Sequence, residues 1–170
     1  MYQEIIYECK PDLIIECGTW RGGSALYLAN LCDILRHGMV LTVDINRWIG
    51  FPQHERIIYV TGSSTDRSIF KQVSSLADGF KNIMVILDSD HTKQHVINEL
   101  DLYAPLVTPR QYLVVEDTNI HGHPVRMDLP AGPFEAVETW LPKHPEFQQD
   151  RACERFLMTF NPSGYLRRVK

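Results

Sequence analysis

The sequence predicts an α/β fold in which a mainly parallel sheet of seven strands is covered by helices on both faces. Two observations lead to this prediction. Short β-branched apolar runs alternate with stretches of helical apolar spacing, and a length of 170 residues suits one domain. The formal net charge is −4, and there is neither a basic tract nor an apolar run of about 18 residues. We therefore expect a single domain, residues 1–170, that neither binds nucleic acid nor spans a membrane.

The expected elements follow one another in a regular order. Asp12–Cys17 (DLIIEC) is predicted to be a buried strand, followed by a helix over Gly22–Leu35 that ends at Gly38. Further strands are predicted at Met39–Ile45, Ile57–Thr61, Asn82–Leu87 and Gln111–Val115, and further helices at Ser68–Leu76, Thr92–Leu106 and Gly132–Leu141. Two final strands, Arg155–Phe160 and Tyr165–Val169, are expected to pair as an antiparallel hairpin around the turn Asn161–Gly164.

Cysteines and tryptophans are interpreted as packing residues. The four cysteines (Cys9, Cys17, Cys32 and Cys153) show no CxxC spacing, so we expect reduced thiols in a cytosolic protein rather than a disulfide or zinc framework. Trp48 and Trp140 are expected to be packing residues rather than substrate platforms.

Acidic residues close four of the predicted parallel strands. Their carboxyl ends carry Glu16, Asp44, Asp88 and the pair Glu116-Asp117. Ligands of such sheets lie beyond the carboxyl ends of the strands, so these side chains are expected to share one edge and to form the functional site.

A glycine turn joins the first strand to the first helix. Its sequence, Glu16-Cys-Gly-Thr-Trp-Arg-Gly-Gly-Ser24, offers close backbone approach and the free N–H groups of a helix start. It departs from the dinucleotide pattern GxGxxG and lacks the GK[ST] of a phosphate loop. Together with Asp44, which can accept both ribose hydroxyls of an adenosine ligand, the turn predicts an adenosine site. The alternative is that the glycines serve only chain reversal and that Asp44 caps a loop. The donor contacts expected within the turn are Glu16, Gly18, Thr19, Gly22, Gly23 and Ser24.

The segment Gly62-Ser63-Ser64 follows the third strand. Its backbone and hydroxyl groups can contact an adenine ring, which makes Ser63 and Ser64 candidate donor contacts. A plain turn in which Ser64 or Thr65 caps the next helix is the alternative.

Carboxylates at the ends of the fourth and fifth strands predict a cation site. Asp88, Glu116 and Asp117 can converge there, and three carboxylates without a cysteine suit Mg²⁺. Asp88 is preferred to Asp90 because it ends the strand, and Asp88 is also a candidate donor contact. The alternative is that these acids only cap loops or pair with arginines.

Histidines lie close to these acids. His91 follows Asp88 by three residues and can act as a general base near a bound hydroxyl, although a histidine at a helix start can also be structural. His91 and His95 have the spacing of a zinc helix, but the intervening residues include no Glu. His121 and His123 either line an acceptor pocket or are solvated loop residues.

Several motifs resemble a known family. They are IIECGTWRGGSA, LTVDI, VILDSDHT, LVVEDTNIHGHPV, GPFEAV and FLMTFNPSGYLRRV. Together they resemble the cephalosporin hydroxylase family, which is similar to rhamnosyl and macrolide-sugar O-methyltransferases. The resemblance extends from about residue 3 to residue 169. Family members usually carry a segment before the first strand. Here the first strand begins close to Met1, which leaves open whether an N-terminal extension is missing.

The resemblance implies a seven-stranded, Rossmann-like methyltransferase fold with a reversed last strand. It also implies S-adenosylmethionine as methyl donor and Mg²⁺ as metal. By that resemblance, residues 16, 18, 22–24 and 44 match donor-binding positions, Asp88, Glu116 and Asp117 match metal positions, and His91 matches the base.

The expected function is therefore methyl transfer from S-adenosylmethionine to a hydroxyl of a sugar or natural-product small molecule. Two alternatives remain open: a nicotinamide-dependent oxidoreductase on a similar sheet, and a non-catalytic domain that binds an adenosine ligand. We expect a cytoplasmic location and a small-molecule acceptor as partner, and we leave a homo-oligomer open.

Overall fold

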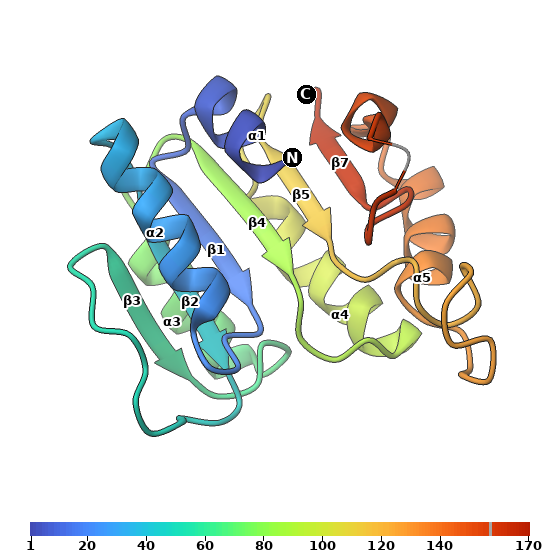
Figure 1. The fold of residues 1–170 in the computed structure, drawn as a ribbon, viewed down its shortest axis with the longest axis horizontal. Coiled ribbons are helices and arrows are strands. Elements are labelled where there is room, and N and C mark those ends of the chain that lie inside the picture. Colours follow the sequence, from blue (N-terminus) through green and yellow to red (C-terminus); the bar gives the residue numbers. More distant parts are fainter. Residues whose placement is uncertain (157) are drawn as a thin grey trace.

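The computed structural model describes residues 1–156 and 158–170. Strands and helices alternate along most of this chain (Figure 1). The strands are β1 Leu13–Cys17, β2 Met39–Asp44, β3 Ile57–Thr61, β4 Ile83–Leu87, β5 Tyr112–Val115, β6 Phe147–Gln149 and β7 Tyr165–Arg168. The α-helices are α1 Tyr2–Cys9, α2 Gly23–Leu35, α3 Arg67–Ala77, α4 Lys93–Tyr103 and α5 Pro133–Trp140.

All seven strands belong to one sheet in the order β3-β2-β1-β4-β5-β7-β6. The first five of these are parallel to one another, whereas β7 runs antiparallel to both β5 and β6. The predicted fold class, a mostly parallel sheet with a reversed last strand, is confirmed. The order reverses between β1 and β4, which is the place where sheets of this type bind ligands.

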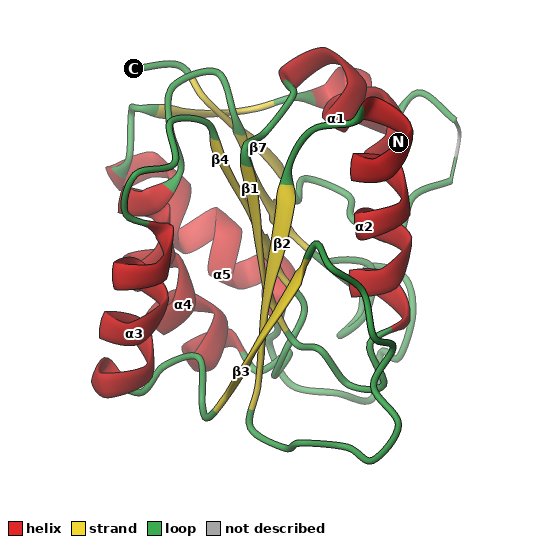
Figure 2. Cartoon of the chain, turned by 90° about the vertical axis from the view of Figure 1, so that its left-hand side faces the viewer, coloured by secondary structure: helices red, strands yellow, loops and turns green. Residues whose placement is uncertain are grey.

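Helices cover both faces of the sheet. Helices α1 and α2 lie on one side, and α3, α4 and α5 on the other (Figure 2). Because side chains of a strand alternate between faces, Ile14 of β1 packs in the core under α1 and α2, while Leu13 and Ile15 pack in the core on the opposite face. Burial on both faces explains why the runs of the central parallel strands are mostly apolar.

The helix ends differ in part from those expected. Helix α2 ends at Leu35, as expected, but the residue that caps it is Arg36 with a left-handed backbone rather than Gly38. Helix α3 is capped by Asp66, whose carboxylate accepts hydrogen bonds from the N–H groups of Ser68 and Ile69. The alternative in which Ser64 or Thr65 caps this helix is therefore wrong. Among the described residues, the longest helix has 13 residues, and no helix is long and apolar enough to cross a bilayer.

The edge strand differs from the predicted one. The described residues of Arg155–Phe160 form no strand, and the partner of β7 at the sheet edge is Phe147–Gln149. The alternating apolar residues Phe156, Met158 and Phe160 are all exposed, although their spacing resembles that of a strand. The period-2 pattern was therefore misleading, because the edge position is already taken by β6.

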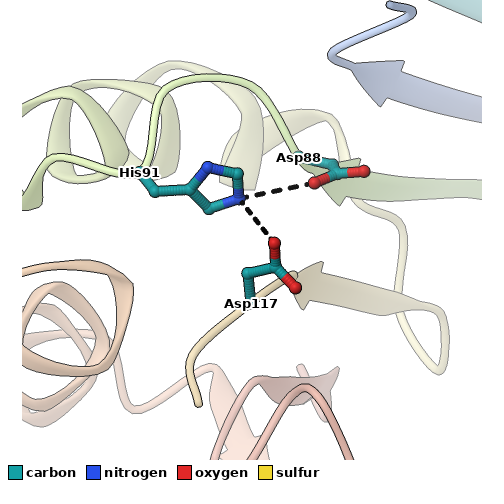
Figure 3. Close-up of side chains that lie close together, drawn as sticks. All are labelled: Asp88, His91 and Asp117. Atoms are coloured by element: carbon teal, nitrogen blue, oxygen red, sulfur yellow. Dashed lines mark ion pairs between the residues drawn. The ribbon is translucent and has the colours of Figure 1, made fainter. Parts of the chain in front are cut away.

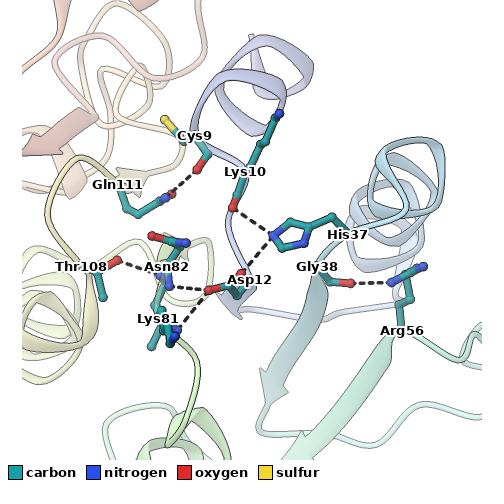
Figure 4. A network of polar contacts seen from close by, with 11 residues as sticks. Cys9, Lys10, Asp12, His37, Gly38, Arg56, Lys81, Asn82, Thr108 and Gln111 are labelled. Carbon is teal, nitrogen blue, oxygen red and sulfur yellow. Dashed lines mark hydrogen bonds and ion pairs between the residues drawn. The ribbon is translucent and has the colours of Figure 1, made fainter.

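An N-terminal helix not predicted from the sequence packs on the sheet through Ile5 and Ile6. Polar contacts anchor its end to the amino edge of the sheet (Figure 4). The Gln111 amide donates to the Cys9 carbonyl at 2.8 Å, and Asp12 accepts from the N–H groups of Lys81 and Asn82. These contacts fasten the edge of the sheet opposite the acidic strand ends.

Candidate functional site

Hydrogen bonds between neighbouring strands continue past their carboxyl ends. The N–H of Gly18 donates to the carbonyl of Val43 at 2.8 Å, and the N–H of Asp88 donates to the carbonyl of Cys17 at 2.7 Å. In the same way, the N–H of Glu116 donates to the carbonyl of Leu87 at 2.9 Å. This ladder places the glycine turn and the acidic residues next to one another, as the sequence predicts.

The glycine turn is held tightly against the end of β4. Gly18 has a φ of +105°, and a Cβ at this position would lie 1.8 Å from the carbonyl oxygen of Asp88. Any larger residue would have to displace the backbone, so glycine is required here for close approach as well as for conformation. Gly22 instead packs against Pro52, because a Cβ there would lie 2.8 Å from its ring.

Asp44 joins the glycine turn to the end of β2. Its Oδ2 accepts a hydrogen bond from the N–H of Trp20 at 2.7 Å, and its Oδ1 accepts one from the N–H of Asn46 at 2.8 Å. Each carboxylate oxygen has a further lone pair, so these contacts leave acceptor capacity for hydroxyl groups of a ligand.

Glu16 lies behind the turn rather than in the cavity. Its Oε2 accepts from the Thr42 hydroxyl at 2.6 Å, and the Thr42 and Thr19 hydroxyls lie 2.6 Å apart. Burial raises the pKa of Glu16 to about 7, despite the opposing hydrogen bonds from Ser24 and Thr42. Glu16 therefore supports the turn through Thr42 and Thr19. Direct contact between Glu16 and the methyl donor stays a prediction.

A cavity of about 890 Å³ opens above these strand ends. Eight of the ten predicted donor contacts line it, and Glu16 and Gly22 are the two that do not. The eight are Gly18, Thr19, Gly23, Ser24, Asp44, Ser63, Ser64 and Asp88.

Three side chains form a polar cluster beside the cavity (Figure 3). Nε2 of His91 lies 3.4 Å from Oδ1 of Asp88 and 3.4 Å from Oδ2 of Asp117. One ligand atom from each residue lies within 4.8 Å of the others. Nε2 of His91 is buried and has no hydrogen-bond partner among the described residues. Burial alone would lower the pKa of His91, but the adjacent carboxylates, first that of Asp88, raise it above its ordinary value.

Glu116 lies next to this cluster but is not one of its three members. Its carboxylate accepts a hydrogen bond from the hydroxyl of Tyr2 in α1. Burial is the main cause that raises the pKa of Glu116 to about 7, and the charge of Asp88 adds to it. The cluster in the structure therefore pairs two of the predicted metal carboxylates with His91, while Tyr2 contacts the third.

Asp90 serves a local role. Its Oδ1 accepts from the N–H of Thr92 at 2.8 Å, and hydrogen bonds from Thr92 lower the pKa of Asp90 below its ordinary value. It therefore fixes the approach to α4, and Asp88 is the member of the pair that faces His91.

Comparisons with known proteins place the chain in a family. The family model for rhamnosyl O-methyltransferase/CmcI matches residues 1–169. The chain belongs to this family. A rhamnosyl O-methyltransferase of Mycobacterium tuberculosis is 42% identical over 172 residues, covering 97% of this chain and 70% of the relative. One from Mycobacterium leprae (strain TN) is 40% identical, covering 97% of this chain and 75% of the relative.

Solved structures also resemble this family member. A CmcI structure with Mg and SAM has a TM-score of 0.72 at 20% identity, covering 99% of this chain and 69% of that one. The MycE methyltransferase from the mycinamycin biosynthetic pathway, in complex with Mg and SAH, has a TM-score of 0.69 at 16% identity, covering 99% of this chain and 48% of that one. At these identities the likeness establishes the methyltransferase fold.

The two loop histidines make contacts within the chain and do not line this cavity. His123 Nε2 lies 2.6 Å from Oε1 of Glu135, and its ring stacks on Phe134 with centroids 3.9 Å apart. Nδ1 of His121 contacts the carbonyl of Pro130. These contacts do not fit the alternative that the two histidines are solvated loop residues, and a place for them in an acceptor pocket stays a prediction.

Some residues of the cavity were not predicted from the sequence. Trp140 is buried in the core as expected, but Trp48 lines the cavity and is 42% exposed, so its assignment as a packing residue is wrong. Trp20 and His95 line the cavity as well. The signal for His95 was present in the sequence as its one-turn spacing from Glu99 on the helix that follows Asp88.

Proposed function

We propose that this chain is an S-adenosylmethionine- and Mg²⁺-dependent O-methyltransferase that acts on a hydroxyl of a sugar or natural-product small molecule. The observation that carries the proposal is one cavity that reaches from the glycine turn and Asp44 to Asp88 and His91 of the polar cluster. The names of the curated relatives and the Mg and SAM of the CmcI structure support it. Family membership also favours methyl transfer over nicotinamide oxidation.

The residues present fit an adenosine-type donor. Gly18 packs closely on the Asp88 carbonyl and brings no side chain into the turn. A Cβ added at Gly23 would have no atom within 4 Å, so the start of α2 is open to a ligand. Asp44 would accept the ribose hydroxyls, and the hydroxyls of Thr19 and Ser24 would border the remainder of the donor. We propose the ten predicted residues as the donor site, with Glu16 and Gly22 acting through the turn.

The polar cluster fits a divalent cation. Carboxylate oxygens of Asp88 and Asp117 within 4.8 Å of one another repel when both are ionised, and a cation offsets this repulsion. We propose that Asp88 and Asp117 hold Mg²⁺ and that Glu116 completes the predicted set. The buried and unpartnered Nε2 of His91 lies between them, where it can accept the proton of an acceptor hydroxyl.

When bound, the donor supplies an electrophilic methyl group and Mg²⁺ supplies positive charge that favours the ionised hydroxyl. The chain's own contribution is orientation and removal of a proton. Asp44 and the glycine turn would fix the methyl donor, and the carboxylates of the polar cluster would position the acceptor. His91 would take the proton of the acceptor hydroxyl at Nε2. Such alignment can contribute roughly 7–11 kcal/mol to lowering a barrier.

A binding and transfer experiment tests the proposal. Isothermal titration should detect S-adenosylhomocysteine binding, and methyl transfer from labelled S-adenosylmethionine to p-nitrophenyl rhamnoside should require Mg²⁺. Asp88→Asn should lower the rate by at least about 100-fold, whereas Asp78→Asn, at the exposed end of α3, should leave it unchanged. Full activity of Asp88→Asn in excess chelator would refute the metal role. Nucleoside binding without transfer to any sugar or phenol would instead identify a non-catalytic binding domain.

His91→Gln separates a base from a metal ligand. If His91 is the base, the variant loses transfer but keeps the Mg²⁺-induced rise in Tm of the S-adenosylhomocysteine complex. Loss of that rise would show that His91 ligates the cation instead.

We also propose that residues 1–170 act as one methyltransferase domain. A cytoplasmic location and a homo-oligomer stay predictions, which fractionation of cells and light scattering would test.

A further inference from the structure

Helix α4 carries a carboxylate that is almost completely buried. The side chain of Glu99 is 1% exposed, and its Oε2 has no hydrogen-bond partner among the described residues. Its Oε1 accepts from the Ser89 hydroxyl at 2.6 Å and lies 3.4 Å from Nε2 of His95. Burying an incompletely paired carboxylate opposes folding, so packing alone does not account for glutamate at this position.

The contacts of Glu99 connect it to the wall of the cavity. Nε2 of His95 lies 3.1 Å from the Ser89 hydroxyl and 3.2 Å from the Ser64 hydroxyl. The buried Tyr103 donates to the carbonyl of Ser64 at 3.0 Å, which fixes that residue from the same helix. Ser64, Ser89 and His95 all line the cavity, whereas Glu99 lies behind them.

This network constrains the imidazole of His95. Nε2 is engaged by Glu99 and by two hydroxyls, whereas Nδ1 has no hydrogen-bond partner in residues 1–156 and 158–170. Because the carboxylate and hydroxyls fix the ring, His95 keeps one orientation in the wall of the cavity, next to the hydroxyls of Ser64 and Ser89. Such a set of groups can both donate and accept hydrogen bonds.

The position of the network suggests which part of a ligand it meets. Ser64 follows β3, which lies beyond β2 on the side of the sheet away from the Asp88–His91–Asp117 cluster. If Asp44 holds the ribose and the cluster marks the reacting end, the base of the nucleoside extends toward β3 and Ser64.

We propose that His95, oriented by the buried Glu99, is a specificity-determining residue that reads the purine edge of the methyl donor together with Ser64 and Ser89. This inference rests on the proposed function. Glu99 is a positioning residue, because it acts through His95 and lies behind the cavity wall.

Two nucleosides test this inference by isothermal titration. S-adenosylhomocysteine carries an amino donor and an unprotonated N1 on its base, whereas S-inosylhomocysteine carries a carbonyl acceptor and a protonated N1. The native protein should bind the adenosyl compound at least about tenfold more tightly. His95→Gln and Glu99→Gln should each lose about tenfold in affinity for it and bring the ratio of the two affinities toward one.

His54→Gln is the matched control, because His54 pairs with Asp33 rather than with a group of the cavity. It should keep both affinities and their ratio. Apo Tm values and circular dichroism check the folding of each variant. If Glu99→Gln does not fold, His95→Gln decides, since that side chain is at the cavity surface.

The outcomes separate the inference from the function. Failure of the native protein to bind either nucleoside overturns the donor site itself. Binding of both with equal affinity, or an unchanged ratio in His95→Gln, overturns the role of His95 and leaves the donor site intact.

Discussion

Replacing Glu16 by glutamine should stabilise the protein at pH 8 and flatten the dependence of its stability on pH. Glu16 is 1% exposed, and its carboxylate accepts a hydrogen bond from Thr42 at 2.6 Å. Burial raises its pKa from an ordinary 4.5 to about 7. The glutamine oxygen can accept the same hydrogen bond without a charge, so the variant keeps the contact and loses the ionisation.

The size of the effect follows from proton linkage. The folded chain binds this proton more tightly than the unfolded chain, so the contribution of Glu16 to stability is complete below pH 4.5 and is lost as the pH rises to about 7. At about 1.4 kcal/mol per pH unit, the loss over this window is roughly 3 kcal/mol. In a domain of this size that corresponds to about 6–12 °C in Tm.

Differential scanning calorimetry between pH 5 and 8.5, with chelator and constant ionic strength, measures the effect. The difference in Tm between Glu16→Gln and the native protein should be small at pH 5 and should grow in favour of the variant up to pH 8. Glu55→Gln, at an exposed position, is the control and should show no such trend. A Tm difference for Glu16→Gln that is constant over the whole range would refute the reasoning.

Two further substitutions test the neighbouring contacts. Gly18→Ala should destabilise the chain by about 2–4 kcal/mol, because Gly18 has a left-handed backbone and the added Cβ would meet the Asp88 carbonyl. Gly23→Ala is the control, because there is open space around its Cβ, and it should unfold at or above the native Tm. Equal Tm values for the two variants would contradict this prediction. Tyr2→Phe removes the hydroxyl that donates to Glu116 and should weaken Mg²⁺ binding by about tenfold, measured as the midpoint of the Mg²⁺-induced rise in Tm. An unchanged midpoint would mean that Tyr2 only anchors α1.

Much of the site was predictable because it depends on local rules. The run Leu13–Cys17 and the glycines after it define a strand, a turn and a helix start through conformational preferences of neighbouring residues. Parallel strands then bring Asp44 and Asp88 to one edge whatever the details of packing. The fold class and most of the residues that line the cavity follow from these two facts.

The edge of the sheet was not predictable in the same way. Phe156, Met158 and Phe160 alternate as strand residues do, yet they are exposed, and Phe147–Gln149 pairs with β7 instead. Which of two short segments occupies an edge depends on backbone pairing with a distant strand, and side-chain periodicity carries no information about that choice.

The sequence by itself determined the order of strands and helices, the glycine turn and the acidic strand ends. Only the tertiary structure decided which side chains meet there: His91 between Asp88 and Asp117, Tyr2 on Glu116, and Glu99 behind His95. The physical reason is the difference in sequence separation between the interacting residues. Backbone conformation is governed by adjacent residues, whereas these polar contacts depend on the packing of helices α1 and α4 against the sheet, which places groups up to 114 positions apart in the chain within hydrogen-bond reach.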